Sequence, residues 1–182
     1  MDSRQDKKQS NRPGYEYLAA YVLGKVIQDL TEEFTNKYTK SYRRRDQMNE
    51  AARSNSQNIA EGFTGESLKS YIKLAGVARG SNEELTKDYE DFLRKHKLTT
   101  WDLKHYKVRE FRKFRAFWKN ENTLNTPNLP NTAEEAANLL ITLCNMEGFL
   151  LKKLVDSLKL KHKTEGGLTE HLYNERRNYR GY

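Results

Sequence analysis

Arginines and lysines interleaved with tyrosines form the first candidate for chemistry in this chain. Residues 34–53 hold six Lys or Arg against two Asp or Glu. Guanidinium groups fork onto phosphate oxygens, and tyrosine rings offer faces on which bases stack. The segment is therefore a candidate contact for RNA or for a single strand, through Lys37, Lys40, Tyr42, Arg43, Arg44, Arg45 and Arg53. A plain basic helix end that faces the carboxyl-terminal dipole is the alternative explanation.

A second basic block spans residues 94–119, with ten Lys or Arg against two Asp or Glu. Within it, Trp101 to Trp118 carries aromatic residues at helical spacing. Such a pattern is typical of a membrane-surface or partner-binding helix, although packing on the parent fold would also explain it. The second set of candidate nucleic-acid contacts is Lys104, Lys107, Arg109, Arg112, Lys113 and Arg115.

The distribution of charge is more informative than the formal net charge of +8. Residues 54–93, between the two blocks, hold four Lys or Arg against seven Asp or Glu. Positive charge gathered in blocks favours a polyanionic partner such as nucleic acid. Solvated basic faces on helices are the alternative.

Residue patterns for enzymatic or metal chemistry are missing. A di-iron site in a helix bundle needs Glu-x-x-His on two helices, and no Glu here has a His three residues later. The sequence has no phosphate-binding Gly-rich loop and no Gly-x-Ser-x-Gly turn. Glu61, next to Ile59 and Ala60, could be a buried acid, but a solvated carboxylate is the more common outcome. We therefore predict no enzyme, cofactor, metal or small-molecule substrate.

Cys144 is the single cysteine and lies in the apolar run 139–151. We expect it to be a buried, inert thiol in a reducing compartment. Met1 to Gly14 is polar, and no run approaches the ~20 apolar residues of a membrane span. The sequence therefore predicts a cytoplasmic protein without a membrane partner.

The elements that must position the basic blocks are helices. Apolar residues recur every three or four positions over 15–38, 46–61, 66–93 and 132–158, with small residues on the inner face of the second segment. Gly62 suits a left-handed residue that ends the second helix, and Thr64 is a candidate N-cap of the third. Gly80 either breaks the third helix or lies with Gly76 on a face where another helix packs closely.

The remaining cap, turn and glycine signals divide the chain into segments. Residues 1–14 are predicted to be a disordered basic arm, 15–160 a four-helix bundle with an insertion at 101–131, and 161–182 a C-terminal suffix. Thr99 or Thr100 is expected to cap the segment after the third helix. Thr132 with Glu135 forms a capping box, and Gly166-Gly167 stops the last long helix. The suffix is expected to be a short docked or induced helix with a basic end.

Residues 54–63 resemble the Ser-x-x-x-Asn-Ile-Ala-Glu-Gly-Phe signature of bacterial four-helix-bundle proteins. The residues of this chain that carry the resemblance are Ser54, Ser56, Asn58, Ile59, Ala60, Glu61, Gly62 and Phe63. That family includes the 23S rRNA intervening-sequence proteins and the accessory variability determinant of diversity-generating retroelements. Residues 70–75 and 80–85 also match its third helix, and the residues from Glu165 to Tyr173 resemble a longer subgroup with a C-terminal suffix.

The resemblance implies an all-α, antiparallel up-down four-helix bundle with a continuous third helix and a basic surface. It also implies a homo-oligomer, with a pentamer favoured, and makes the signature residues structural. Retroelement members bind RNA and a reverse transcriptase without catalysis. Because this chain inserts 101–131, either 101–118 or 132–160 could supply the fourth helix.

Two functions follow from these patterns. The first is an oligomeric, non-enzymatic accessory protein that binds nucleic acid, with RNA favoured. The second is a scaffold whose aromatic segment and suffix dock a partner enzyme such as a reverse transcriptase. An enzyme of unrecognised type is the least favoured alternative.

Overall fold

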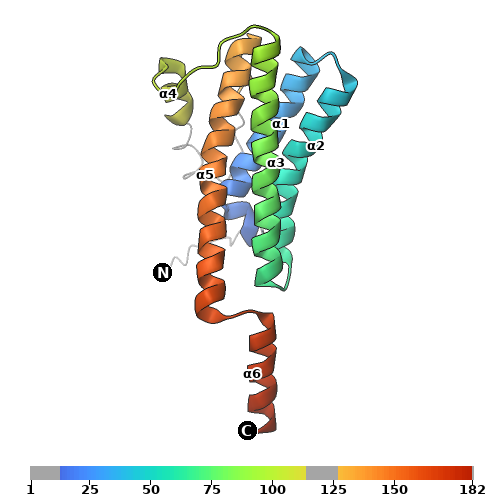
Figure 1. Cartoon of the computed structure of the whole chain (residues 1–182), viewed down its shortest axis with the longest axis vertical. Helices are drawn as coiled ribbons and strands as arrows, with labels where there is room; N and C mark the ends of the chain where they lie inside the picture. The colour runs from blue at the N-terminus through green and yellow to red at the C-terminus, as the bar shows by residue number, and fades with distance from the viewer. Residues whose placement is uncertain (1–12, 114–126, 182) are drawn as a thin grey trace, which may run out of the picture.

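The computed structural model describes residues 13–113 and 127–181, which are helical and contain no β-strand. A 3-10 turn, η1 (Gly14–Tyr17), precedes the α-helices. These are α1 (Ala19–Tyr38), α2 (Tyr42–Thr64), α3 (Leu68–Lys95), α4 (Tyr106–Lys113), α5 (Ala133–Glu165) and α6 (Leu168–Arg180). Helices α1, α2, α3 and α5 lie side by side, and α6 extends beyond one end of them (Figure 1). The predicted all-helical bundle is confirmed at this level.

The core is built from one apolar stripe per long helix. Because α-helical side chains three and four positions apart share a face, the spacing in the sequence becomes a buried stripe. The largest fully buried side chains include Leu23, Ile27, Leu30 and Phe34 of α1, Met48 of α2, Tyr89 of α3 and Leu139, Leu140 and Leu143 of α5. The Phe34 ring packs edge-on against those of Tyr89 and Phe92, with centroids 5.2 and 4.9 Å apart.

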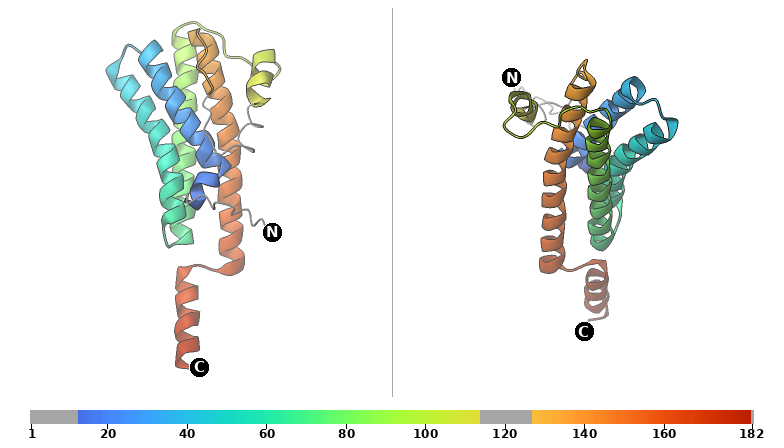
Figure 2. Two further views of the ribbon diagram at one scale, coloured as in Figure 1. Left: turned by 180° about the vertical axis from the view of Figure 1, so that it is seen from behind. Right: turned by 45° about the horizontal axis from the view of Figure 1, so that its top comes forward.

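Helix α5 supplies the fourth member of the bundle. It packs against both α1 and α3, whereas α4 lies against α5 beside the bundle (Figures 1 and 2). Val108 and Phe111 of α4 are buried in that contact. The alternative that residues 101–118 take the fourth position is therefore wrong for the described part of that segment.

The amino-terminal boundaries of the first two helices differ from the prediction. Leu18 is extended, so 14–17 form a separate 3-10 turn and α1 begins at Ala19. The connector between α1 and α2 is only Thr39 to Ser41, because the Ser41 hydroxyl accepts a hydrogen bond from the Arg44 backbone N–H and caps α2. The second helix, which the sequence predicts from residue 46, therefore begins at Tyr42, and Arg43, Arg44 and Arg45 are helical.

The turn between α2 and α3 also corrects two predictions. Gly62 is inside α2 and buried, and its role is packing, since a Cβ there would collide with the Tyr71 ring. Thr64 does not cap α3, because its hydroxyl donates back to the Ala60 carbonyl at 3.0 Å. Ser67 is the N-cap, accepting from Ser70 N at 3.4 Å.

Helix α3 is continuous, so Gly80 does not break it. Gly76 and Gly80 do not lie on a packed face either. Both are exposed, and a Cβ added at either position would meet nothing within 4 Å among the described residues. The small residues of this stretch that are buried are Ala75 and Ala78.

The carboxyl-terminal suffix is helical but not docked on the bundle. Gly166 adopts a φ of 80°, which ends α5 as predicted, and α6 leads away from it (Figures 1 and 2). Every residue of α6 is exposed. None of the helices in the described part of the chain combines the length and apolarity of a membrane span. The predicted arm 1–14 lies outside the described residues except for Pro13 and Gly14.

Candidate nucleic-acid interface

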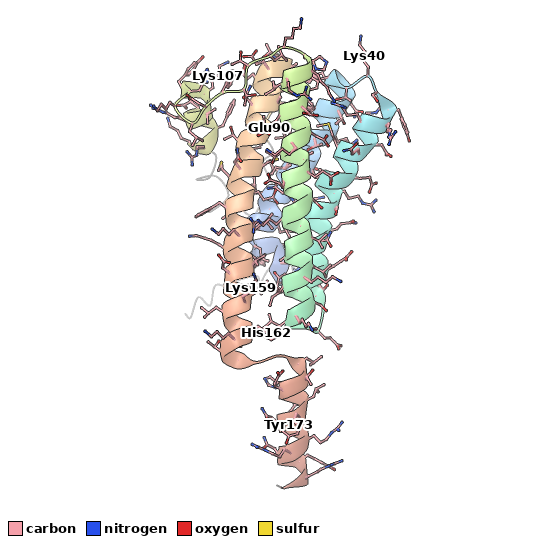
Figure 3. All side chains as sticks on the ribbon, in the orientation of Figure 1. Lys40, Glu90, Lys107, Lys159, His162 and Tyr173 are labelled. Atoms are coloured by element: carbon pink, nitrogen blue, oxygen red, sulfur yellow. The ribbon has the colours of Figure 1, made fainter. Side chains whose placement is uncertain are left out.

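Most of the first basic block and the described part of the second, far apart in the sequence, lie at the same end of the bundle. The first surrounds the α1–α2 connection, and the second contains α4, which lies beside the start of α5. In Figure 3, Lys40 and Lys107 mark this end on opposite sides, whereas Lys159 and His162 lie at the other end. We call Lys40, Arg43, Arg44, Arg45, Lys104, Arg109 and Arg112 the basic end.

Arginines in the first turn of α2 form the densest part of the basic end. Arg43 is exposed and Arg44 and Arg45 are half-buried, and none of the three forms an ion pair within the described residues. The Arg45 guanidinium lies 5.6 Å from the centroid of the Tyr42 ring, which is 72% exposed. Cations and an aromatic face are therefore presented together.

These arginines occupy the unfavourable end of a helix. The amino end of a helix carries partial positive charge, which repels cations. A basic helix end that interacts with the carboxyl-terminal dipole therefore explains Lys37, in the last turn of α1, but not Arg43, Arg44 and Arg45. The positive charge at this position needs another reason.

Two tyrosines of the first block have different roles. Tyr38 is half-buried, and its hydroxyl donates to the Pro130 carbonyl at 3.1 Å. It therefore anchors the chain before α5. Tyr42 alone of the two offers an open ring face. Nearby, burial raises the pKa of the Asp88 carboxyl, and the positive charge of Arg44 opposes part of that rise.

The cations of the second block fall into two groups, those that pair with a carboxylate and those that do not. Lys107 forms a 2.7 Å ion pair with Glu135, and the hydrogen bond to Glu135 raises the pKa of Lys107. Lys113 pairs with Glu110 at 2.7 Å. Lys104, Arg109 and Arg112 are exposed and make no ion pair within 13–113 and 127–181. Arg115 lies outside the described residues.

Hydrogen bonds that the sequence did not reveal fix the chain entering α4. Asn138 Oδ1 accepts from the Trp101 N–H at 2.8 Å, and Asn138 Nδ2 donates to the Thr99 carbonyl at 2.9 Å. The Trp101 indole N–H donates to Glu134 at 3.0 Å. Asp102, rather than Thr99 or Thr100, caps the following turn, accepting from the backbone of Lys104 and His105 at 2.8 and 3.0 Å.

Further cations at the end of α3 were not among the predicted contacts. Arg94 and Lys95 pair with Asp91 at 2.9 and 3.6 Å, and both sit where the helix dipole favours cations. They need no nucleic acid to explain them. Lys97, exposed with a φ of 56°, follows them.

Arg53 does not join the basic end. It lies eight residues after Arg45, about 12 Å further along α2 at ~1.5 Å per residue, and its nearest acidic partner is Glu50 at 3.8 Å. The predicted cations in the described residues therefore divide into three groups. The first is the basic end, the second is Lys37, Lys107 and Lys113, which a helix end or a carboxylate accounts for, and the third is Arg53 alone.

The signature residues make packing and hydrogen-bonding contacts. The hydroxyl groups of Ser54 and Ser81 lie 3.0 Å apart, joining α2 to α3, and Ser56 donates to Gln28 of α1 at 2.9 Å. Asn58 donates to the Ser54 carbonyl at 2.7 Å, and Ile59 is fully buried. Of the rest, Ala60 is half-buried, Gly62 buried, and Glu61 and Phe63 exposed.

Candidate catalytic groups are few in the described residues. They contain no group of three or more His, Cys, Asp or Glu side chains that could hold a metal. Cys144 is fully buried, and burial raises the pKa of its thiol well above the usual range. Glu61 is exposed, and the buried carboxyl is Glu147 of α5, which the sequence analysis missed.

Comparison with known proteins gives one family. A family model described as 23S rRNA-intervening sequence protein matches residues 17–112, just over half of the chain. The match covers α1, α2, α3 and most of α4 and ends before α5. Neither the curated proteins nor the solved structures contain a match.

Proposed function

The chain belongs to the 23S rRNA-intervening sequence protein family, and we propose that it is a non-enzymatic accessory protein that binds structured RNA through its basic end. The observation that carries the proposal is the placement of Arg43, Arg44 and Arg45 in the first turn of α2, where none of them forms an ion pair within the described residues. Cations at this position cost stability in the free protein. A bound phosphate backbone would offset that cost.

The chemistry of the basic end suits RNA. Guanidinium groups make charge-assisted, bidentate contacts with phosphates, and each neutralised phosphate releases counterions. Tyr42 beside Arg45 supplies a stacking face for an unpaired base. Lys104, just before α4, and Arg109 and Arg112 of α4 would contact a second part of a folded RNA. A compact RNA hairpin, which presents phosphates on two sides, fits this division better than an extended strand.

The test is RNA binding by charge-matched variants. We expect R43A/R44A/R45A to weaken the binding of a fluorescent RNA hairpin at least tenfold in an anisotropy titration. The control K152A/K159A/K163A removes the same charge from exposed positions in the half of α5 that lies far from the basic end. It should bind within about twofold of the wild type. Equal weakening by both variants would show non-specific attraction and sink the proposal.

The assembly is part of the proposal. We infer an antiparallel up-down bundle, which the three-residue connections 39–41 and 65–67 support, and a cytoplasmic homo-oligomer with five copies favoured. The family resemblance supports the oligomer. Light scattering coupled to gel filtration, with and without RNA, measures the mass directly, and a monomer at micromolar concentration would contradict it.

A second candidate function rests on α6. This helix has thirteen exposed residues, including Leu172, Tyr173 and Tyr179 at 53, 65 and 93% exposure. A helix of this length is marginally stable alone in water, so a partner protein such as a reverse transcriptase would complete it. Retention of that partner in a pull-down with a chain truncated at Glu165 would refute the docking role of α6.

A further inference from the structure

A layer of three buried polar side chains and one glycine crosses the bundle, with one residue from each long helix. Gly24 of α1, Asn55 of α2, Asn82 of α3 and Glu147 of α5 are all buried. Asn55 Nδ2 donates to Glu147 Oε2 at 2.7 Å, and Asn82 Nδ2 donates to the Cys144 carbonyl at 2.9 Å. A carboxyl group with 0% exposure is unusual, since ionised groups are rarely buried without a charged partner.

Three oxygen atoms of this layer, Glu147 Oε1, Asn55 Oδ1 and Asn82 Oδ1, are buried and accept no hydrogen bond within the described residues. The first two face Gly24, where an added Cβ would lie 2.7 Å from Glu147 Oε1 and 3.6 Å from Asn55 Oδ1. Two acceptors cannot bond to each other, and buried polar atoms are nearly always paired. A single hydrogen between them would satisfy both.

The groups around Glu147 do not favour its ionised form. On α1, α2 and α3 the facing residues are Gly24, Asn55 and Asn82, none of which titrates. On α5 the neighbouring ionisable group is the Cys144 thiol. The nearest cation on α1, Lys25, donates to Gln28 at 2.9 Å. Burial raises the pKa of Glu147 to about 8, and the Asn55 hydrogen bond opposes only part of that rise.

We propose that Glu147 binds a proton inside the folded bundle and forms a reciprocal acid–amide pair with Asn55. Asn55 Nδ2–H donates to Oε2, and Oε1–H donates to Asn55 Oδ1. The proton comes from solvent on folding and returns to it on unfolding. The pair fastens α2 to α5 across the space that Gly24 leaves under α1, so the bundle carries a buried proton site.

The direction of the pH dependence follows from linkage. Between pH 4.5 and about 8 the folded chain holds a proton on Glu147 that the unfolded chain has lost. Stability therefore falls as pH rises through this window and levels above it. At the acidic end of this pH window, the protonated pair of Glu147 and Asn55 is fully present. Alkaline conditions place an unpaired charge in the core and loosen the contact between α2 and α5.

Substitution of the acid by its amide tests the pair. In E147Q the carboxamide presents a carbonyl and an N–H group to Asn55, so both hydrogen bonds form without a proton. We expect the urea midpoint of the wild type to fall across the window, whereas that of E147Q should change far less. The control E61Q makes the same change at an exposed position on α2 and should follow the wild type.

A spectroscopic measurement on the wild type keeps the proposal testable if E147Q does not fold. The infrared difference spectrum near neutral pH should contain the C=O stretch of one protonated carboxylic acid, and that band should disappear as the pH is raised beyond about 8. Absence of the band below that pH would overturn the proposal. So would identical pH profiles of wild type and E147Q.

Discussion

Replacement of Asn138 by alanine should detach the chain that leads into α4. The side chain is 2% exposed and holds both the Trp101 N–H and the Thr99 carbonyl, at 2.8 and 2.9 Å. These bonds connect α5 to a segment that has no regular secondary structure of its own. Loss of Asn138 therefore affects the position of every cation on α4.

The magnitude follows from the burial of each orphaned group. A buried backbone donor left without a partner costs ~1–3 kcal/mol, and a lost hydrogen bond whose acceptor returns to water costs about 1 kcal/mol. Trp101 is half-buried, so its N–H belongs to the first class, whereas Thr99 is exposed. We expect N138A to lower the free energy of unfolding by about 2–4 kcal/mol.

Urea unfolding and hydrogen exchange measure the two effects separately. Exchange of the backbone amides of residues 101–113 should accelerate in N138A, while the buried core of α1 and α3 keeps its order of protection. N145A is the control, because Asn145 is exposed on the same helix. A loss of stability below about 0.5 kcal/mol, with unchanged exchange in α4, would refute the assigned role of Asn138.

Three further predictions follow. The plot of log affinity against log salt should become shallower by about 2–3 in R43A/R44A/R45A, since each lost phosphate contact removes ~0.7 on a single strand and ~0.9 on a duplex. An unchanged slope in a salt titration would contradict the contacts. Gly62→Ala should lower the free energy of unfolding by ~1–3 kcal/mol, because the added methyl group overpacks against Tyr71. Gly76→Ala, at an exposed position, should instead stabilise α3 by up to ~1 kcal/mol. Equal effects of the two substitutions in thermal unfolding would refute the packing role of Gly62. Cys144 should react with a thiol reagent only after denaturation, because burial raises its pKa, and rapid reaction of the native chain would show that the thiol is accessible.

The core could be predicted because it depends on local periodicity. Leu23, Ile27, Leu30 and Phe34 recur at helical spacing and are all buried, and Thr132 and Gly166 bound α5 as their chemistry suggests. The sequence therefore predicts each of the long helices. The family signature added the continuity of α3, which local chemistry at Gly80 left open.

The boundaries of α2 and the path of the chain before α4 were misread because the contacts that decide them are weak sequence signals. Ser41 caps α2 without the Glu at N3 that completes a capping box, so the arginines looked like a connector. Gly62 invited a helix end, although its missing Cβ is needed by Tyr71. The path from Thr99 to His105 depends on Asn138 and Glu134, which are distant in the sequence and could not be paired without the fold.

The buried acid did leave a signal. Glu147 lies four residues after Leu143 and four before Leu151, at a core position of the apolar stripe, and Asn55 interrupts the inner face of α2 in the same way. A carboxylate and an amide at core positions of two helices point to a buried pair. The sequence could not show that both face Gly24, which is what makes the pair specific.

The central claim, that RNA lies across the basic end, is tested most directly by mapping where RNA cross-links to the intact protein. A photoreactive RNA hairpin should cross-link to peptides that contain Tyr42 and to peptides from residues 101–113, and R43A/R44A/R45A should lose the first set. Cross-links confined to the distal half of α5 or to α6 would contradict the account.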